Sequence, residues 1–219
     1  MQIDKIKNKG QAQLFRNSYL EYFTKTHPLV IWVMYMPVFV LLPYYSYNTL
    51  DFSGLKVAIM FLSGILFWTF FEYMMHRFIF HWVSGNPRAQ RISYVLHGNH
   101  HEFPRDRQRL FMPPVPSLII SSLVFLLIYA IMQKNAMPFF PGFLFGYLVY
   151  GSMHYAIHAW NPRYKWMKPI WRNHQMHHYK DDHRGFGVSS HIWDVVFGTQ
   201  FDFKKEKEDK EEVKKLMFK

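Results

Sequence analysis

The chain has 219 residues, of which half are hydrophobic and a fifth aromatic, and its formal net charge is +11. It contains no cysteine, which excludes disulfides, thiolate zinc sites and cysteine-ligated clusters. Its mean hydropathy is only −0.14, so the apolar and polar residues must be segregated into blocks.

Four apolar blocks predict an all-α integral membrane protein, because a spanning helix needs about 20 mostly apolar residues. The first block follows a polar, basic start and precedes no small-residue cleavage site, so we do not expect a signal peptide. The four transmembrane helices are expected at residues 29–45, 55–80, 115–132 and 139–160. They belong to one membrane-embedded domain, residues 1–203, which a charged tail follows at residues 204–219.

The basic residues predict how the chain is oriented. Residues 46–54 carry no Lys or Arg and residues 133–138 carry one, whereas residues 1–28, 77–114 and 161–219 carry five, six and thirteen. Cytoplasmic segments of membrane proteins carry the Lys/Arg excess, so both termini and the middle loop are expected in the cytoplasm. The same bias explains the net charge, which suits anionic lipid headgroups, and we expect no nucleic-acid partner.

Ten of the thirteen histidines fall in four stretches, all expected at the cytoplasmic boundary of the membrane. Two stretches read His-x-x-His-His, which puts three imidazoles on one side of a helix. Neutral imidazole is a strong ligand for Zn, Fe, Cu or Ni, and ten ligands exceed what one ion accepts. The pattern predicts a dimetal site in a cytoplasmic helical cap, with the ligands His76, His81, His97, His100, His101, His154, His158, His174, His177 and His178.

Other uses of membrane histidines fit this pattern less well. Membrane haems are held by single histidines that face each other from different helices, so adjacent His-His pairs would serve no purpose. A metal transporter places its ligands near the bilayer midplane, not at its edge. His27 is isolated and reads as structural, and His183 and His191 follow a glycine-rich turn and match no pair spacing.

The four stretches, in this order, resemble the fatty acid hydroxylase/sterol desaturase superfamily, and within it the fatty acid 2-hydroxylases. The resemblance runs from about Glu72 to Phe201 and includes Gly185–Ser189 and Trp193-Asp194 after the last stretch. It implies an integral-membrane, non-haem diiron monooxygenase that uses O2 and two electrons to hydroxylate a lipid acyl chain. The motifs are His76-Arg-Phe-Ile-Phe-His81, His97-Gly-Asn-His100-His101, His154-Tyr-Ala-Ile-His158 and His174-Gln-Met-His177-His178, with Gly146-Tyr147 and Tyr150 ahead of His154.

Two departures from the relatives affect what the resemblance implies. Relatives often have Asp where this chain has Gly151, which leaves open the acceptor that orients His154. The chain has no room for a cytochrome b5 domain before the first span, so we expect a separate electron donor of the cytochrome b5 or ferredoxin type. Redox-inert zinc can occupy the same nitrogens in a purified sample without supporting the reaction.

Three further residues are candidates around the metal site. We expect Phe186 and Trp193 near the mouth of an apolar slot for the acyl chain, although both residue types are equally common in cores and at membrane interfaces. Glu72, one helical turn before His76, is either a hydrogen-bond acceptor for a ligand or a helix-end carboxylate.

The competing functions are a carotenoid ring hydroxylase, a sterol-type desaturase or oxidase, and a non-enzymatic metal-binding membrane protein.

Helix geometry predicts how the ligands divide between two ions. Adjacent residues on a helix point about 100° apart, so His177 and His178 should reach different ions. Residues at i and i+4 lie nearly above one another and can chelate one ion. His76 and His81 are five apart, so they share an ion only if the helix ends or distorts. One consistent division puts His76, His81, His97, His101 and His177 on one ion and His100, His154, His158, His174 and His178 on the other.

Overall fold

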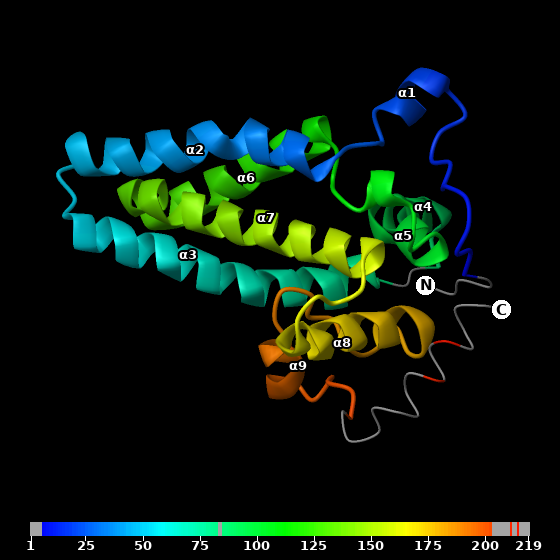
Figure 1. Cartoon of the computed structure of the whole chain (residues 1–219). Coiled ribbons are helices and arrows are strands. Elements are labelled where there is room, and N and C mark those ends of the chain that lie inside the picture. Colours follow the sequence, from blue (N-terminus) through cyan, green and yellow to red (C-terminus); the bar gives the residue numbers. More distant parts are fainter. Residues whose placement is uncertain (1–5, 83–84, 203–210, 212–213, 215–219) are drawn as a thin grey trace.

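The computed structural model describes residues 6–82, 85–202, 211 and 214, and its regular elements in that part are all helices, which confirms the all-α class. Four long helices form a bundle, and shorter helices gather at one end of it (Figure 1). The predicted tail, residues 204–219, lies outside the described residues apart from positions 211 and 214. The long helices are α2 (Pro28–Asn48), α3 (Gly54–Met74), α6 (Pro114–Met132) and α7 (Ala136–Ala159).

Within the described residues, three helical runs are long and apolar enough to cross a membrane, where the sequence predicted four spans. They are Pro28–Asn48, Gly54–Phe80 and Arg107–Ala159. The third run contains both α6 and α7, which the short 3-10 helix η4 (Gln133–Asn135) separates. The chain folds back at this point, because Phe125 of α6 packs against Phe140 of α7 with ring centroids 5.0 Å apart. The four predicted blocks therefore correspond to four helices within three runs.

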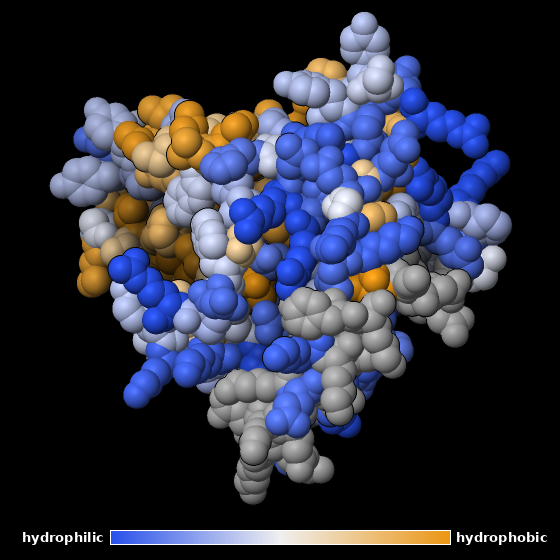
Figure 2. Space-filling model, turned by 45° about the vertical axis from the view of Figure 1, so that its right-hand side comes forward, coloured by the Kyte–Doolittle hydropathy of each residue, from blue (hydrophilic) through white to orange (hydrophobic). Residues whose placement is uncertain are grey.

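Helix α7 is the centre of the bundle and packs against α2, α3 and α6. Glycines allow α3 and α7 to approach closely: a Cβ on Gly142 would lie 1.8 Å from the carbonyl oxygen of Phe61. Small residues at helix interfaces serve this purpose in membranes, where packing rather than hydrophobic burial drives association. The outer faces of the long helices stay apolar, and hydrophobic side chains gather on their side of the molecule, with hydrophilic ones over the opposite end (Figure 2).

The cap consists of short helices at the end of the bundle where α3 and α7 finish (Figure 1). Helix α8 carries the last histidine stretch and has Pro169 in its first turn, where a missing N–H costs nothing. Two π-helical segments, η1 and η2, continue α3 and α4 directly into the first two histidine stretches. The cap elements are η1 (Met75–Phe80), α4 (Pro87–Ser93), η2 (Tyr94–Gly98), α5 (Asn99–Glu102), η3 (Arg107–Arg109), η5 (Lys165–Met167), α8 (Lys168–Tyr179) and α9 (Ile192–Val196).

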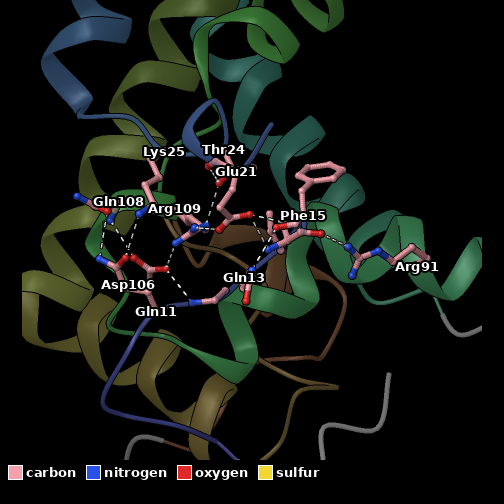
Figure 3. Close-up of polar contacts among 12 residues, drawn as sticks. Gln11, Gln13, Phe15, Glu21, Thr24, Lys25, Arg91, Asp106, Gln108 and Arg109 are labelled. Atoms are coloured by element: carbon pink, nitrogen blue, oxygen red, sulfur yellow. Dashed lines mark hydrogen bonds and ion pairs between the residues drawn. The ribbon is translucent and has the colours of Figure 1, made fainter. Parts of the chain in front are cut away.

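The N-terminal segment, which includes α1 (Ser18–Tyr22), is fastened to the cap by a buried ionic cluster (Figure 3). The guanidinium of Arg109 binds the carboxylates of Glu21 and Asp106 and donates to Thr24 Oγ1 at 3.1 Å. Its side chain is only 4% exposed, so all of these groups are paired where water is largely excluded. The cluster holds the N-terminal segment beside the loop that leads into α6.

Candidate metal centre

The ten predicted histidines meet at the junction of the bundle and the cap, although they come from four distant parts of the chain. Their ring nitrogens form two groups of five, and within each group one nitrogen per residue lies within 4.8 Å of the others. His177 and His178 belong to different groups, as their neighbouring positions on α8 predict. The first group is His76, His81, His97, His101 and His177, and the second is His100, His154, His158, His174 and His178.

The predicted distortion between His76 and His81 takes the form of the π-helix η1. The backbone N–H of His81 donates to the carbonyl oxygen of His76 at 3.3 Å. This i→i+5 turn brings residues five apart to one side of the helix, which an α-helix does not do. The two imidazole centroids consequently lie 5.1 Å apart.

Backbone carbonyls fix the orientation of three of these histidine rings. His76 Nδ1 lies 2.5 Å from the carbonyl oxygen of Phe186, and His177 Nδ1 lies 2.6 Å from that of Arg184. Because a carbonyl oxygen only accepts, Nδ1 carries the proton and Nε2 directs its lone pair into the site. His154 Nδ1 is oriented in the same way, by the carbonyl oxygen of Leu110 at 3.3 Å.

The carbonyl oxygen of Leu110 is the hydrogen-bond acceptor for His154, which the sequence could not assign because Gly151 stands where relatives often have Asp. A Cβ on Gly151 would lie 2.3 Å from the ring of Phe111, so the glycine makes room for that ring against α7. Phe111 is 4% exposed in this position, and the carbonyl of the residue before it reaches His154. A backbone group from the loop before α6 therefore orients His154 in this chain.

The spacing of the nitrogens fits metal ions with five or six ligands. In the first group, the Nε2–Nε2 distances are 3.1 Å for His76–His97 and 3.0 Å for His81–His177. In the second group, His154–His100 is 2.8 Å and His158–His174 is 2.9 Å. Two nitrogens bound to one ion at about 2.1 Å are about 3.0 Å apart at a right angle and about 3.4 Å apart at the tetrahedral angle. Two Nε2 atoms at these distances either share a proton in a hydrogen bond or, when both present lone pairs, repel unless a cation lies between them.

Burial keeps these histidines in the neutral form that can bind a metal. Desolvation, followed by the neighbouring imidazoles, lowers the pKa of His177 to about 3. The same causes hold other histidine pKa values well below the ordinary range, so these rings stay uncharged at neutral pH. The affected cap residues are His97, His100, His101, His174 and His178.

Two buried carboxylates hold residues 186–189, and the carbonyl of Phe186 in this segment orients His76. Asp194 accepts hydrogen bonds from the backbone N–H groups of Phe186 and Gly187 at 2.9 and 2.8 Å. Glu72 accepts from the backbone N–H groups of Val188 and Ser189 at 2.7 and 2.9 Å. The sequence left two roles open for Glu72, an acceptor for a histidine or a helix-end carboxylate, and its hydrogen bonds go to this segment. The sequence had assigned no role to Asp194.

An apolar cavity of about 690 Å³ lies beside the second histidine group and between α3, α6 and α7. His97, His100 and His154 form part of its wall, and aromatic and aliphatic side chains form most of the rest. The wall includes Leu14, Phe15, Leu20 and Phe23 from the N-terminal segment, Trp68 and Phe71 from α3, Phe111, Val124 from α6, and Phe140, Phe143, Leu144, Tyr147 and Tyr150 from α7.

Phe186 and Trp193 do not line this cavity, so their predicted place at its mouth is corrected. Phe186 is 3% exposed and packs against the ligand rings, 5.7 Å from His76 between centroids. Trp193 packs on Phe70 at 4.9 Å and donates to Thr69 Oγ1. The reason is that Glu72 and Asp194 hold the segment after the last histidine stretch against the first histidine group, so that Phe186 packs on His76 and His177 and not on the cavity. Sequence position does not reveal these contacts.

Residues 61–199 match the sequence model of the fatty acid hydroxylase family. The chain belongs to this family. It is accordingly an oxidoreductase of lipid metabolism, as the resemblance of the histidine stretches predicted. A solved structure of full-length scs7p, in which only the hydroxylase domain is visible, matches with a TM-score of 0.81 and 36% identity over 89% of this chain and 74% of that chain.

Curated relatives of this hydroxylase-family chain carry specific activities in their names. The ceramide very long chain fatty acid hydroxylase SCS7 of Saccharomyces cerevisiae is 38% identical over 87% of this chain. The dihydroceramide fatty acyl 2-hydroxylase FAH1 of Arabidopsis thaliana is 32% identical over 89% of this chain, and the fatty acid 2-hydroxylase of Mus musculus is 29% identical over 85%. The chain spans 82% of the Arabidopsis protein, but only 50% of the yeast and 56% of the mouse protein.

Proposed function

We propose that this chain hydroxylates the 2-position of a lipid acyl chain, in a fatty acid or a sphingolipid, with two iron ions held by the ten histidines and with O2 as co-substrate. The names of the relatives support this substrate class. The observation that carries the proposal is the cavity, because His97, His100 and His154 form its wall at one end while its remaining length is almost entirely apolar.

The distribution of polar groups along the cavity supports attack near the head of the acyl chain. The polar wall residues His100, Asn99 and Arg109 belong to the cap, and Ser117 and Ser121 add hydroxyl groups in the first two turns of α6. The wall residues of α6 and α7 that lie farthest from the cap are the apolar Val124 and Phe140. An apolar tail is stabilised by burial in the far end, and a polar head avoids it. Carbon 2, next to the carbonyl carbon, would therefore lie beside the histidines.

The protein's own contribution is to hold the ligands and the substrate and to exclude water. Bound iron would supply the oxidising power needed to attack an unactivated methylene, whereas zinc at the same nitrogens would not. The backbone carbonyls of Phe186, Arg184 and Leu110 orient His76, His177 and His154 for binding. The aromatic wall of the cavity keeps water from the reacting carbon. Two electrons would come from a separate carrier of the cytochrome b5 or ferredoxin type.

We further propose that α2, α3, α6 and α7 each cross the membrane, with both termini and the histidine groups on the cytoplasmic side. The Lys/Arg count supports this orientation, since twenty-four of the twenty-six basic residues lie in the segments assigned to the cytoplasm. The fold-back at η4 supports two crossings for the run Arg107–Ala159.

The function is tested by expressing the protein in cells that make no 2-hydroxylated lipid and analysing their lipids by mass spectrometry. The parent chain should produce 2-hydroxy acyl lipids, and His177→Ala should abolish them while remaining in the membrane. His183→Ala is the matched control, because His183 lies in neither histidine group and should keep the activity. Persistent 2-hydroxy product with His177→Ala would contradict the dimetal site. Product with a new double bond, or a hydroxylated carotenoid, would identify a competing activity instead.

A further inference from the structure

The wall of the cavity extends far from the histidines along α6 and α7. Val124 and Phe140 are the wall residues of these helices that lie farthest from the histidine end. Phe140 is 5% exposed and packs against Phe125 of α6, with ring centroids 5.0 Å apart. We call the two wall residues, Val124 and Phe140, the floor of the cavity.

The distance from the histidines to the floor follows from the geometry of α7. One stripe of this helix faces the cavity from His154 down to Phe140, with members three or four residues apart between these ends. Phe140 and His154 are fourteen residues apart, which corresponds to about 21 Å at 1.5 Å per residue. One leaflet of the hydrocarbon core is about 15 Å thick. An acyl chain that extends from the histidines to the floor is therefore longer than one leaflet is thick.

Val124 and Phe140 carry side chains that substitutions can enlarge or shorten, so the depth of the cavity can be changed. Ile128 and Ala136, which lie farther from the histidine end along α6 and α7, are buried in the same apolar cluster as Phe140. Removing the phenyl ring of Phe140 would open space in continuation of the cavity, and a larger side chain at Val124 would fill space above it. The polar groups that would hold a head group lie at the opposite end and are left unchanged.

We propose that Val124 and Phe140 set the maximum length of the acyl chain that the protein accepts. This inference rests on the proposed function for its substrate class, a saturated acyl chain whose head lies at the histidine end. Each methylene added within the cavity should raise affinity about fourfold, because it is removed from water into an apolar site. Once the tail meets the floor, a further methylene has no place, and affinity should fall.

The test compares two floor variants with two matched controls. Phe140→Ala deepens the cavity, and Phe139→Ala removes the same ring from the adjacent residue, which is 8% exposed and packs on Phe67 outside the cavity wall. Val124→Trp shortens the cavity, and Leu123→Trp adds the same bulk at an exposed neighbour outside the wall. Binding of saturated fatty acids of increasing length is measured on the purified, metal-loaded chain without an electron donor, and 2-hydroxy products of mixed lengths are measured with one.

The preferred length should move to longer chains with Phe140→Ala and to shorter chains with Val124→Trp, and both controls should keep the parent profile. If Phe140→Ala does not fold, Val124→Trp alone decides. Unchanged length profiles in the floor variants, or equal shifts in their controls, would overturn the inference. If the parent forms no 2-hydroxy product but the binding profiles shift as stated, the proposed function fails and the role of the floor stands.

Discussion

The substitution Asp194→Asn tests whether a buried carboxylate outside the ligand set controls the metal centre. Asp194 is 0% exposed and accepts four hydrogen bonds: from the backbone N–H groups of Phe186 and Gly187, from Thr199 Oγ1 at 2.7 Å and from Asn173 Nδ2 at 3.3 Å. Each carboxylate oxygen takes two of them. An asparagine keeps the shape, but its amide nitrogen replaces one oxygen and cannot accept.

The magnitude follows from this arrangement. Either orientation of the amide loses two hydrogen bonds to a charged acceptor, worth about 1.5–3 kcal/mol each. Because the shape is conserved, we expect the low end, a loss of about 3 kcal/mol in the free energy of unfolding. The carbonyl of Phe186, which orients His76, would no longer be fixed, and loss of such support typically lowers metal affinity about 10–100-fold.

The assay combines thermal unfolding of the purified protein with its metal content after dialysis against a weak chelator. Asp194→Asn should melt at a lower temperature and retain less metal than the parent. Asp181→Asn is the control, since Asp181 is 39% exposed, with the guanidinium of Arg184 at 3.7 Å, and exposed pairs contribute about 0–1 kcal/mol. If both variants have the same melting temperature and the same metal content, Asp194 does not support the histidines in the way proposed.

Three further outcomes are expected. A topology reporter fused after Phe111 should be cytoplasmic and one placed near Asn48 should not; the opposite pattern would reject the proposed orientation. Gly142→Ala should destabilise the bundle by about 1–3 kcal/mol, because its new Cβ would meet the Phe61 backbone, whereas Gly54→Ala meets nothing within 4 Å and should melt like the parent. Removing metal with a strong chelator should lower the melting temperature, because facing imidazole lone pairs lose the cation between them, and equal melting with and without metal would count against both ion sites.

The sequence by itself determined the features that depend on local spacing. The apolar blocks predicted the four long helices, because the length and composition of a block decide whether it forms an apolar helix. The pairing of histidines within each stretch also followed from spacing, since residues at i and i+4 share a side and neighbours such as His177 and His178 do not. Which stretches join in one group was left as one consistent division, and the structure has the same two groups. The distortion between His76 and His81 was also predictable, because two residues five apart do not share a side of an ideal α-helix.

Only the tertiary structure decided the features that join residues far apart in the chain. The acceptors for His76, His177 and His154 are backbone carbonyls, which every residue possesses, so no residue type marks them in a sequence. The residues that form the wall of the cavity could not be predicted from the sequence either. Phe186 and Phe140 are equally apolar, and only packing places Phe186 against the histidines and Phe140 at the floor. Spacing along a helix is fixed by covalent geometry, whereas these contacts depend on how the helices and the cap dock against each other.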